Sequence, residues 1–356
     1  MISRLSIRQL IEEREESLSP YAVKSKSSRG RLRHEEPCPI RTAFQRDRDR
    51  IIHAKAFRRL KHKTQVFIAP LGDHFVTRLT HTLEVAQIAR TIARALNLNE
   101  DLTEAIALGH DLGHTPFGHV GEEVLNELYY QGFRHNEQSL RVVDRLENDG
   151  LGLNLTWEVR DGILNHSKTR ADIVGQDWGE VRTLEGEAVK IADFIAYINH
   201  DIGDAIRADI ITESNLPSAA VTMLGHSHSQ RINTMVSDVI GYSWAARGYN
   251  SYNNSDRPTM IMSPQILEAT NTLRDFLFDR VYNLRSAEEE AERAREVMRS
   301  LYQYFNKHSD SLPPEYSVYS DEIEQRVVDY IAGMTDQYAL RMAEELSLTV
   351  DKANFP

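Results

Sequence analysis

The chain has 356 residues, of which 41% are hydrophobic and 27% charged, as is ordinary for a soluble globular protein. A single cysteine, Cys38, excludes an intrachain disulfide and a cysteine-based zinc site, and it fits a reducing cytoplasm. No apolar run approaches the roughly 20 residues of a membrane span, the acid-rich N-terminus disfavours a signal peptide, and the net charge of −11 disfavours a general nucleic-acid binder.

The N-terminal residues predict one short amphipathic helix within residues 1–20. Residues 24–40 are polar, contain Gly30 and two prolines, and predict a loop or flexible segment. From Arg46 to His62 the apolar residues recur at helical spacing, which predicts a helix.

Positive charge is concentrated in one part of this acidic chain. Nine basic residues fall between positions 41 and 63: Arg41, Arg46, Arg48, Arg50, Lys55, Arg58, Arg59, Lys61 and Lys63. Only Asp47 and Asp49 oppose them, so the cluster predicts a site for a small polyanion. The alternative is a solvated helix face on which alternating arginine and aspartate residues form ion pairs.

Two short runs after this helix predict a small β-hairpin, the only convincing strand pair in the sequence. Gln65–Ile68 and His74–Thr77 flank a Pro-Leu-Gly-Asp turn at residues 70–73.

A long helix is predicted from Arg78 to Leu96, and it carries a histidine on its apolar stripe. Val85, Ile88 and Ile92 follow His81 at helical spacings of 4, 7 and 11 residues. A histidine in such a position is more often a core residue than a ligand. The ligand interpretation gains support because a His-Asp pair follows 29 residues later, one helix further on.

The most informative stretch is Ala105–Glu123, read AIALGHDLGHTPFGHVGEE. An apolar helical run delivers His110 and Asp111 side by side, and Gly113, Pro116 and Gly118 then break the helix. Imidazole and carboxylate groups are ligands for Zn, Mn, Fe and Ni, so the pair predicts a divalent metal ion and a water molecule without choosing the metal. The alternative is a histidine that caps the carbonyls of a helix end.

The helix predicted over residues 187–207 has two stripes. Ile191, Ile195, Ile198 and Ile202 form one, and Asp193, Tyr197 and Asp201 form the other. An offset of two residues is about 200° around a helix, so the stripes lie on opposite sides. The helix is therefore either an amphipathic surface helix with an acidic outer face, or one that presents Asp193 to a metal and Tyr197 and Asp201 to a ligand.

The remaining sequence is predicted to be helical over residues 263–307 and 322–346. His226 and His228 suggest a second metal site, but a surface loop is favoured because no carboxylate lies within five residues of either. The prediction is an all-α fold with one small β-hairpin. Its parts are an N-terminal helix and flexible segment (1–40), a core (41–260) and a helical C-terminal region packed on the core (261–356).

His81, His110 with Asp111, and Asp193 stand in an order that resembles the HD-domain metal-dependent phosphohydrolases. Four blocks, residues 46–67, 78–90, 109–123 and 190–201, narrow the resemblance to the bacterial dGTPase family, the deoxyguanosinetriphosphate triphosphohydrolase-like proteins. The similarity extends at least from Arg41 to Asp204.

The resemblance implies a role for each matching residue. The implied metal ligands are His81, His110, Asp111 and Asp193, for Mg, Mn or another transition metal such as Fe, Ni or Zn. His119 and Glu122 match a catalytic His-acid pair. The implied substrate contacts are His114 beside the phosphates, Arg78 on the α-phosphate, Gln65 near the sugar 3′-hydroxyl, Tyr197 under the deoxyribose and Asp201 at the 3′ side of the sugar.

The implied activity is hydrolysis of a deoxynucleoside triphosphate, with dGTP the most expected, to deoxynucleoside and tripolyphosphate. The implied assembly is a homo-oligomer, an allosteric nucleotide is a further candidate partner, and nucleic acid is not required. The alternatives are another HD-type nucleotide phosphohydrolase or phosphodiesterase, and a non-catalytic nucleotide sensor or single-strand nucleic-acid binder on the same scaffold.

Overall fold

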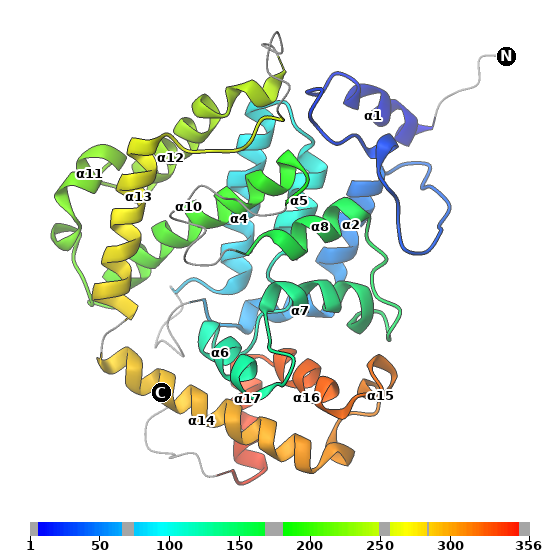
Figure 1. Cartoon of the computed structure of the whole chain (residues 1–356), viewed down its shortest axis with the longest axis vertical. Coiled ribbons are helices and arrows are strands. Elements are labelled where there is room, and N and C mark those ends of the chain that lie inside the picture. Colours follow the sequence, from blue (N-terminus) through cyan, green and yellow to red (C-terminus); the bar gives the residue numbers. More distant parts are fainter. Residues whose placement is uncertain (1–5, 66–74, 168–180, 249–256, 283–284, 349–356) are drawn as a thin grey trace. The chain divides into compact units, whose positions relative to one another are not determined.

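A computed structural model describes residues 6–65, 75–167, 181–248, 257–282 and 285–348 (Figure 1). Helices dominate these residues and no strand is assigned among them, so the prediction of an all-α fold is confirmed. Residues 66–74 of the predicted β-hairpin lie outside the described residues. At its described flanks, Thr64 and Thr77 form a single antiparallel bridge. No helix in the described parts of the chain is both long and apolar enough to cross a membrane.

The chain forms two compact units whose segments interleave along the sequence. Unit 1 comprises residues 1–52, 82–110 and 154–277, and unit 2 comprises residues 53–81, 111–153 and 278–356. The division predicted at residues 40 and 260 stays a prediction, since the compact units do not follow the chain order.

Unit 1 is built from nine described α-helices. They are α1 (Ile7–Glu15), α2 (Ala43–His53), α4 (Arg78–Ala95), α5 (Glu100–Gly109), α8 (Trp157–Asn165), α10 (Leu184–Arg207), α11 (Ser218–Leu224), α12 (His228–Tyr242) and α13 (Pro264–Leu277). The last residue of α2 and the first four residues of α4 belong to unit 2. Short 3₁₀ turns are η1 (Ser25–Ser27), η4 (Glu213–Asn215) and η5 (Trp244–Arg247).

The centre of unit 1 is α10. Its N-cap, Thr183, accepts a hydrogen bond from the Gly186 amide at 3.1 Å, and the four stripe isoleucines named above are fully buried. The helix packs against α5, α8, α12 and α13, and most of its 24 residues are buried. The surface-helix interpretation of this segment is therefore wrong, because both of its faces are covered.

Two glycines allow α5 and α8 to approach closely. A Cβ atom on Gly162 would lie 2.6 Å from the Ile106 side chain, and one on Gly109 would lie 2.6 Å from that of Ile163. Any larger residue would push the helices apart. Both helices lead into a buried histidine, His110 after α5 and His166 after α8.

Residues 24–40, predicted to be a loop or flexible segment, are irregular except for the short turn η1. Between α1 and α2, buried carboxylates of unit 1 accept backbone amides: Glu15 from Ser25 at 2.6 Å, Glu185 from Val23 at 3.0 Å and Glu158 from Arg29 at 2.7 Å. Glu158 and Glu185 come from distant helices, so the composition of the segment itself does not reveal these bonds.

Unit 2 collects the remaining helices. They are α3 (Lys55–Arg59), α6 (His119–Leu128), α7 (His135–Arg141), α14 (Arg285–Lys307), α15 (Tyr316–Tyr319), α16 (Ile323–Ala332) and α17 (Asp336–Glu345). Shorter turns are the 3₁₀ turns η2 (Leu60–His62) and η7 (Ser309–Ser311) and the π turns η3 (Val142–Leu146) and η6 (Phe278–Tyr282).

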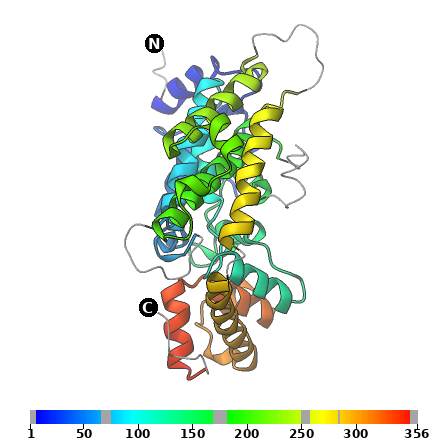
Figure 2. The same cartoon turned by 90° about the vertical axis from the view of Figure 1, so that its left-hand side faces the viewer.

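The long helix α14 packs against α6, α16 and α17, which lie beside it in both views (Figure 1, Figure 2). Its apolar face, including Val297 and Leu301, shares one hydrophobic cluster with Leu125 of α6 and Ile331 of α16. Phe117, from the loop before α6, inserts into the same cluster with 2% of its surface exposed. The loop between His110 and His119 is thus packed against the C-terminal helices.

Candidate active site

In unit 2, the first turn of α4 faces Asp111. The Arg78 guanidinium donates to Asp111 Oδ2 at 2.8 Å, and His81 Nε2 lies 3.9 Å from the same oxygen. All three side chains are at most 3% exposed. The arrangement agrees with the spacing, since residues 78 and 81 are three apart and lie on one helix face.

In unit 1, His110 directly follows α5. Its Nδ1 lies 2.7 Å from the Ala107 carbonyl oxygen, which can only accept, so Nδ1 carries the proton and Nε2 the lone pair. That Nε2 lies 3.9 Å from Asp193 Oδ1 on α10. The predicted capping role is therefore present, and it fixes the orientation of the ring.

These distances suit a metal-ion site. Two donor atoms that each lie about 2.1 Å from one ion are at most about 4.2 Å apart. The His81–Asp111 and His110–Asp193 separations, both 3.9 Å, fall within that limit. Each pair supplies one imidazole and one carboxylate, which are donors that divalent transition metals accept.

Three further side chains cluster around Glu122 in unit 2. His119 begins α6, and its Nδ1 lies 3.4 Å from a Glu122 oxygen. His135, the first residue of α7, lies 2.9 Å from both Glu122 oxygens through Nδ1 and also donates its amide. His114 stacks on His135 with ring centres 4.2 Å apart. The fold thus brings together His114, His119 and Glu122, three of the predicted site residues, with His135.

Nearby charges and burial shift the pKa values of Glu122 and His114. Burial acts to raise the pKa of the Glu122 carboxyl, but His135 and the hydrogen bonds from His119 and His135 outweigh it and hold that pKa well below its usual range. Burial, followed by the positive charge of Arg78, lowers the pKa of His114 well below its ordinary value. At neutral pH, Glu122 is therefore ionised and His114 neutral. The His119 side chain is 74% exposed and accessible to a ligand.

Two other sets of metal-type ligands in unit 2 have donor atoms within 4.8 Å of one another: Asp111, His114 and His135, and His114, His119 and Glu122. The parallel stack of His114 on His135, with 15° between the rings, prevents both imidazoles from aiming at one ion. The stack concerns the first set only, since His135 is not a member of the second. No set found among the described residues contains the predicted pair His226 and His228.

On α10, Tyr197 and Asp201 follow Asp193 at intervals of four residues. Tyr197 is half-buried and contacts Phe194 edge to face, with ring centres 5.7 Å apart. Asp201 is 3% exposed, and its Oδ1 lies 2.7 Å from His200 Nδ1. Burial, followed by the charge of Asp201, raises the pKa of the Tyr197 hydroxyl, so it remains protonated.

Sequence reasoning missed His135 and Arg274. The Arg274 guanidinium, on α13, is 4% exposed, and its positive charge acts on the Tyr197 hydroxyl against the effect of burial. Both are single residues outside the matching blocks, and no spacing connects them with the other site residues. A lone histidine at the start of a helix was the only signal for His135.

Gln65 is the last described residue before the gap at 66–74, and it belongs to unit 2. Its backbone oxygen lies 3.4 Å from where a Cβ on Gly118 would be, and an Arg78 nitrogen lies 3.1 Å from that point. Its side-chain oxygen is buried with no hydrogen-bond partner in the described part of the chain. Gln65 therefore lies beside the start of α6 with an acceptor to offer.

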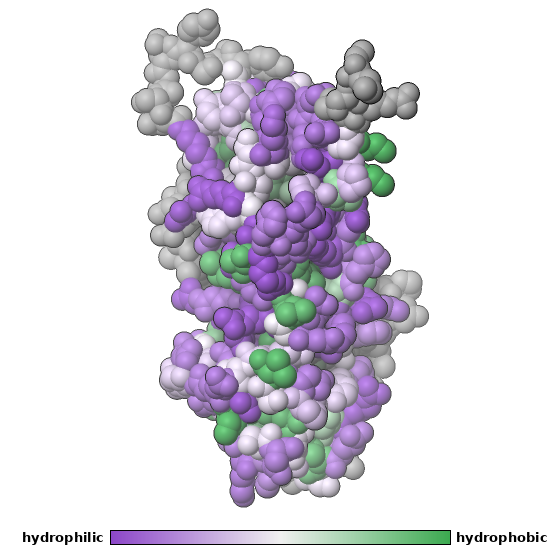
Figure 3. Space-filling model, turned by 90° about the vertical axis from the view of Figure 1, so that its right-hand side faces the viewer, coloured by the Kyte–Doolittle hydropathy of each residue, from purple (hydrophilic) through white to green (hydrophobic). Residues whose placement is uncertain are grey.

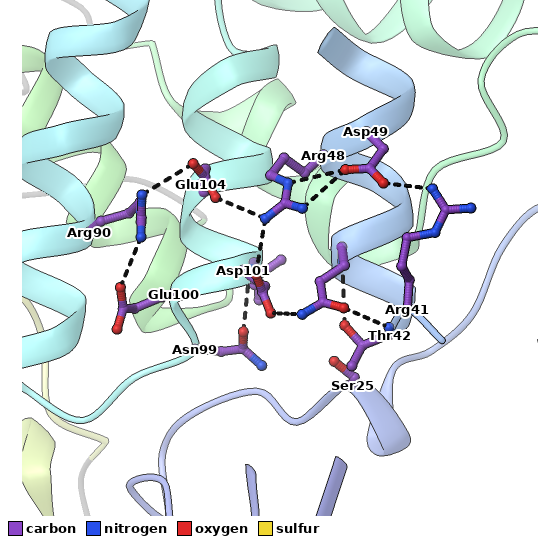
Figure 4. A network of polar contacts seen from close by, with 12 residues as sticks. Ser25, Arg41, Thr42, Arg48, Asp49, Arg90, Asn99, Glu100, Asp101 and Glu104 are labelled. Atoms are coloured by element: carbon purple, nitrogen blue, oxygen red, sulfur yellow. Dashed lines mark hydrogen bonds and ion pairs between the residues drawn. The ribbon is translucent and has the colours of Figure 1, made fainter. Parts of the chain in front are cut away.

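The predicted polyanion site at the basic cluster is wrong for its first half (Figure 4). Arg41 pairs with Asp49 at 2.6 Å, and Arg48 reaches Asp49, Asp101 and Glu104 at 3.1–3.4 Å. Arg46 and Arg50 both pair with Glu35, at 2.8 and 2.5 Å. The ion-paired helix face is the correct interpretation, and acids outside the cluster supply most of its partners.

Family models match two regions of the chain: an HD domain over residues 78–198 and a phosphohydrolase-associated domain over residues 260–345. A deoxyguanosinetriphosphate triphosphohydrolase-like protein of Caldanaerobacter subterraneus subsp. tengcongensis is 59% identical over 348 residues, or 97% of this chain and 96% of that protein. Proteins of the same name from Desulfatibacillum aliphaticivorans and Clostridium tetani are 50% and 48% identical and cover 96% and 95% of this chain and 98% and 95% of their own lengths.

The helical fold, the matched HD domain and the clusters of histidine and aspartate that can bind metal define an HD-type phosphohydrolase. Within that class, the chain belongs to the family of deoxyguanosinetriphosphate triphosphohydrolase-like proteins, since relatives at 48–59% identity cover nearly its whole length. The resemblance seen in the sequence is confirmed.

Proposed function

We propose that this protein hydrolyses a deoxynucleoside triphosphate to a deoxynucleoside and intact tripolyphosphate, in the cytoplasm. The names of its relatives favour dGTP as the substrate. The observation that carries the proposal is the convergence of Arg78 and His81, one turn of α4, on the Asp111 carboxylate. If His81 and Asp111 hold a metal ion, Arg78 would add a second positive charge beside the same carboxylate, which would favour binding of a phosphate group there.

The proposed metal ligands are His81, His110, Asp111 and Asp193, and the ion is Mg, Mn or another transition metal such as Fe, Ni or Zn. When bound, it would supply Lewis-acid polarisation of a phosphate oxygen. The contribution of Arg78 is to neutralise charge on the α-phosphate, which the family resemblance assigns to it. A guanidinium suits this role because it remains protonated and offers several donors in one plane.

The proposed proton carrier is His119. The Glu122 carboxylate lies 3.4 Å from its Nδ1 and orients the ring, so that Nε2 is available for the leaving 5′-oxygen or for the attacking water. His135 Nδ1 lies 2.9 Å from both oxygens of that carboxylate. Because His114 is neutral, it offers the phosphates a hydrogen bond without a fixed charge.

The proposed sugar contacts are Tyr197, Asp201 and Gln65, and Arg274 is a candidate cation for the phosphates. A tyrosine ring against C2′ leaves no room for a 2′-hydroxyl, so clash would select deoxynucleotides over ribonucleotides. Arg274 is included among the candidates because its guanidinium is buried and its charge acts on the Tyr197 hydroxyl.

The test is hydrolysis in ¹⁸O-labelled water with each dNTP and Mn²⁺ or Mg²⁺, followed by phosphorus NMR and mass spectrometry. We expect the label on tripolyphosphate and none on the deoxynucleoside. Pyrophosphate with dNMP, or orthophosphate with dNDP, would show that a different phosphorus is attacked and would support another HD-type phosphohydrolase. Nucleotide binding without turnover would support a sensor, and His119→Ala is the control for contaminating activity.

A further inference from the structure

The loop of residues 111–118 carries Asp111 and His114 and leads into His119, yet it contributes few hydrogen bonds of its own. The described bonds within it are His114 N–H to Asp111 O at 3.1 Å and Thr115 Oγ1 to Gly118 O at 2.8 Å. Phe117 has φ of 59°, in the left-handed region that aromatic residues rarely adopt. Such a conformation persists only when surrounding contacts hold it.

One of these contacts is a buried carboxylate of the phosphohydrolase-associated region. Asp336, the first residue of α17, is 6% exposed. Its Oδ1 accepts the Phe117 amide at 3.0 Å, and its Oδ2 accepts the Thr64 amide at 2.8 Å. One side chain thus joins the loop to the segment before the gap at 66–74.

The second contact is a buried lysine. Lys63 is 2% exposed, and its Nζ donates to the His114 carbonyl and, at 2.8 Å, to the Ala332 carbonyl at the end of α16. Its own carbonyl accepts the Arg78 amide at 3.1 Å. Burial lowers the pKa of Lys63 to about 7, and a neutral amine has two N–H groups, which matches the two carbonyl acceptors.

We propose that Lys63 and Asp336 are positioning residues, through which the junction of α16 and α17 fixes the backbone of His114 and Phe117 and so sets the geometry of the catalytic loop. This inference rests on the proposed function for its effect on turnover. It gives the C-terminal helices a part in the chemistry without a residue that touches substrate. The competing explanation is that the two side chains only stabilise the fold.

Two variants test this in the full-length protein. Asp336→Asn keeps one acceptor oxygen at nearly constant volume, and Lys63→Met keeps the length of the side chain and removes both donations. Tyr330→Phe is the matched control, because it removes the hydrogen bond between the Tyr330 hydroxyl of α16 and the Tyr338 hydroxyl of α17, at 3.0 Å, and leaves Lys63 and Asp336 in place. Amide hydrogen exchange of residues 112–118, thermal unfolding, kcat and KM are measured for all three.

We expect exchange in the loop to accelerate by about tenfold in both test variants, with little change elsewhere in unit 2. We expect kcat to fall on the order of 10- to 100-fold with KM nearly unchanged, as for a small misplacement of catalytic groups. The double variant should lose less than the product of the single losses, since both residues hold one loop. Tyr330→Phe should leave both readouts unchanged.

Unchanged exchange in the loop would overturn the proposal, and so would faster exchange with unchanged kcat. Exchange that rises equally across unit 2, together with a lower Tm, would show a purely structural role. If the wild-type protein turns over no dNTP, the proposed function fails, but the exchange data, with a Mn²⁺ titration of each variant, still decide whether the two residues position the loop.

Discussion

At Asp111, each carboxylate oxygen has a different neighbour. Oδ2 accepts from Arg78 and faces His81, and Oδ1 lies 3.8 Å from His114 Nε2. In the Asp111→Ala variant, we expect bound metal to be lost and turnover to fall by more than about 100-fold, the upper range for losing a residue that only supports a metal ligand. Elemental analysis of the purified variant measures the metal, and Asp49→Ala, in a surface ion pair, is the control. Full metal occupancy in Asp111→Ala would refute the ligand assignment.

Tyr197 offers a test of sugar selection. In Tyr197→Ala, the space beneath the sugar opens, and we expect the ratio of dGTP to GTP turnover to fall on the order of tenfold or more, the usual range for shape discrimination in a pocket. Tyr197→Phe keeps the ring and should keep the ratio. Steady-state kinetics with both nucleotides give the answer, and equal ratios in all three proteins would assign the discrimination to another residue.

The residues that the sequence predicted and those it missed differ in how they are encoded. His110 and Asp111 are adjacent in the chain, and Arg78 and His81 share one helical turn, so local spacing reveals them. His135 and Lys63 reach their partners through tertiary packing: Lys63 bonds Ala332, 269 residues away. No local pattern records such a contact, and a buried lysine is uncommon enough that composition argues against expecting it.

At the scale of elements, the hydrophobic periodicity predicted the buried isoleucine face of α10 but not the helices that pack around it. The isoleucine stripe follows the 3.6-residue repeat and is buried as predicted. The helix also packs against α12 and α13, which come from later in the chain, so its own periodicity could not predict these neighbours. Residues 16–40 show the same limit, because their polar composition does not reveal that Glu158 and Glu185 accept their amides.

Glu185, in the first turn of α10, anchors that segment and makes stability depend on pH. Its Oε1 accepts the amides of Val23 and Asn99, at 3.0 and 3.1 Å, and burial raises its pKa to about 7. Because the folded-state pKa lies above the unfolded value, its contribution is fully present below about pH 4.5 and is lost as the pH rises through 7.

Glu185→Gln should remove this loss, since glutamine resembles the protonated acid and its oxygen can accept both amides. Relative to wild type, the free energy of unfolding of the variant should rise between pH 4.5 and 7 by up to about 3 kcal/mol and then level off. Urea unfolding at five pH values from 4.5 to 8.5 measures it. The exposed Glu13→Gln on α1 is the control, and a pH-independent difference for Glu185→Gln would contradict the prediction.

At the scale of the whole molecule, the two compact units cannot be inferred from the order of segments along the chain. Unit 2 combines residues 53–81 and 111–153 with everything from Phe278 onward, and Phe117 and Leu125 share a core with helices about 200 residues later. A division read from composition and motif limits follows the chain and cannot show such interleaving. The all-α class and the order of the proposed metal ligands could be predicted from the sequence, because both depend on local patterns.

Assembly is a property of the whole molecule that the family resemblance predicts: a homo-oligomer, with a helical C-terminal third beyond the matched catalytic blocks. In the view of Figure 3, hydrophilic residues predominate and apolar residues form small separate groups. Light scattering coupled to size exclusion should give an integral multiple of 40.8 kDa, at least two, at micromolar concentration. Mass is measured across a hundredfold dilution, with and without dNTP, because a ligand that binds between subunits shifts the equilibrium toward the oligomer by mass action. A mass of 40.8 kDa under all these conditions would refute the oligomer.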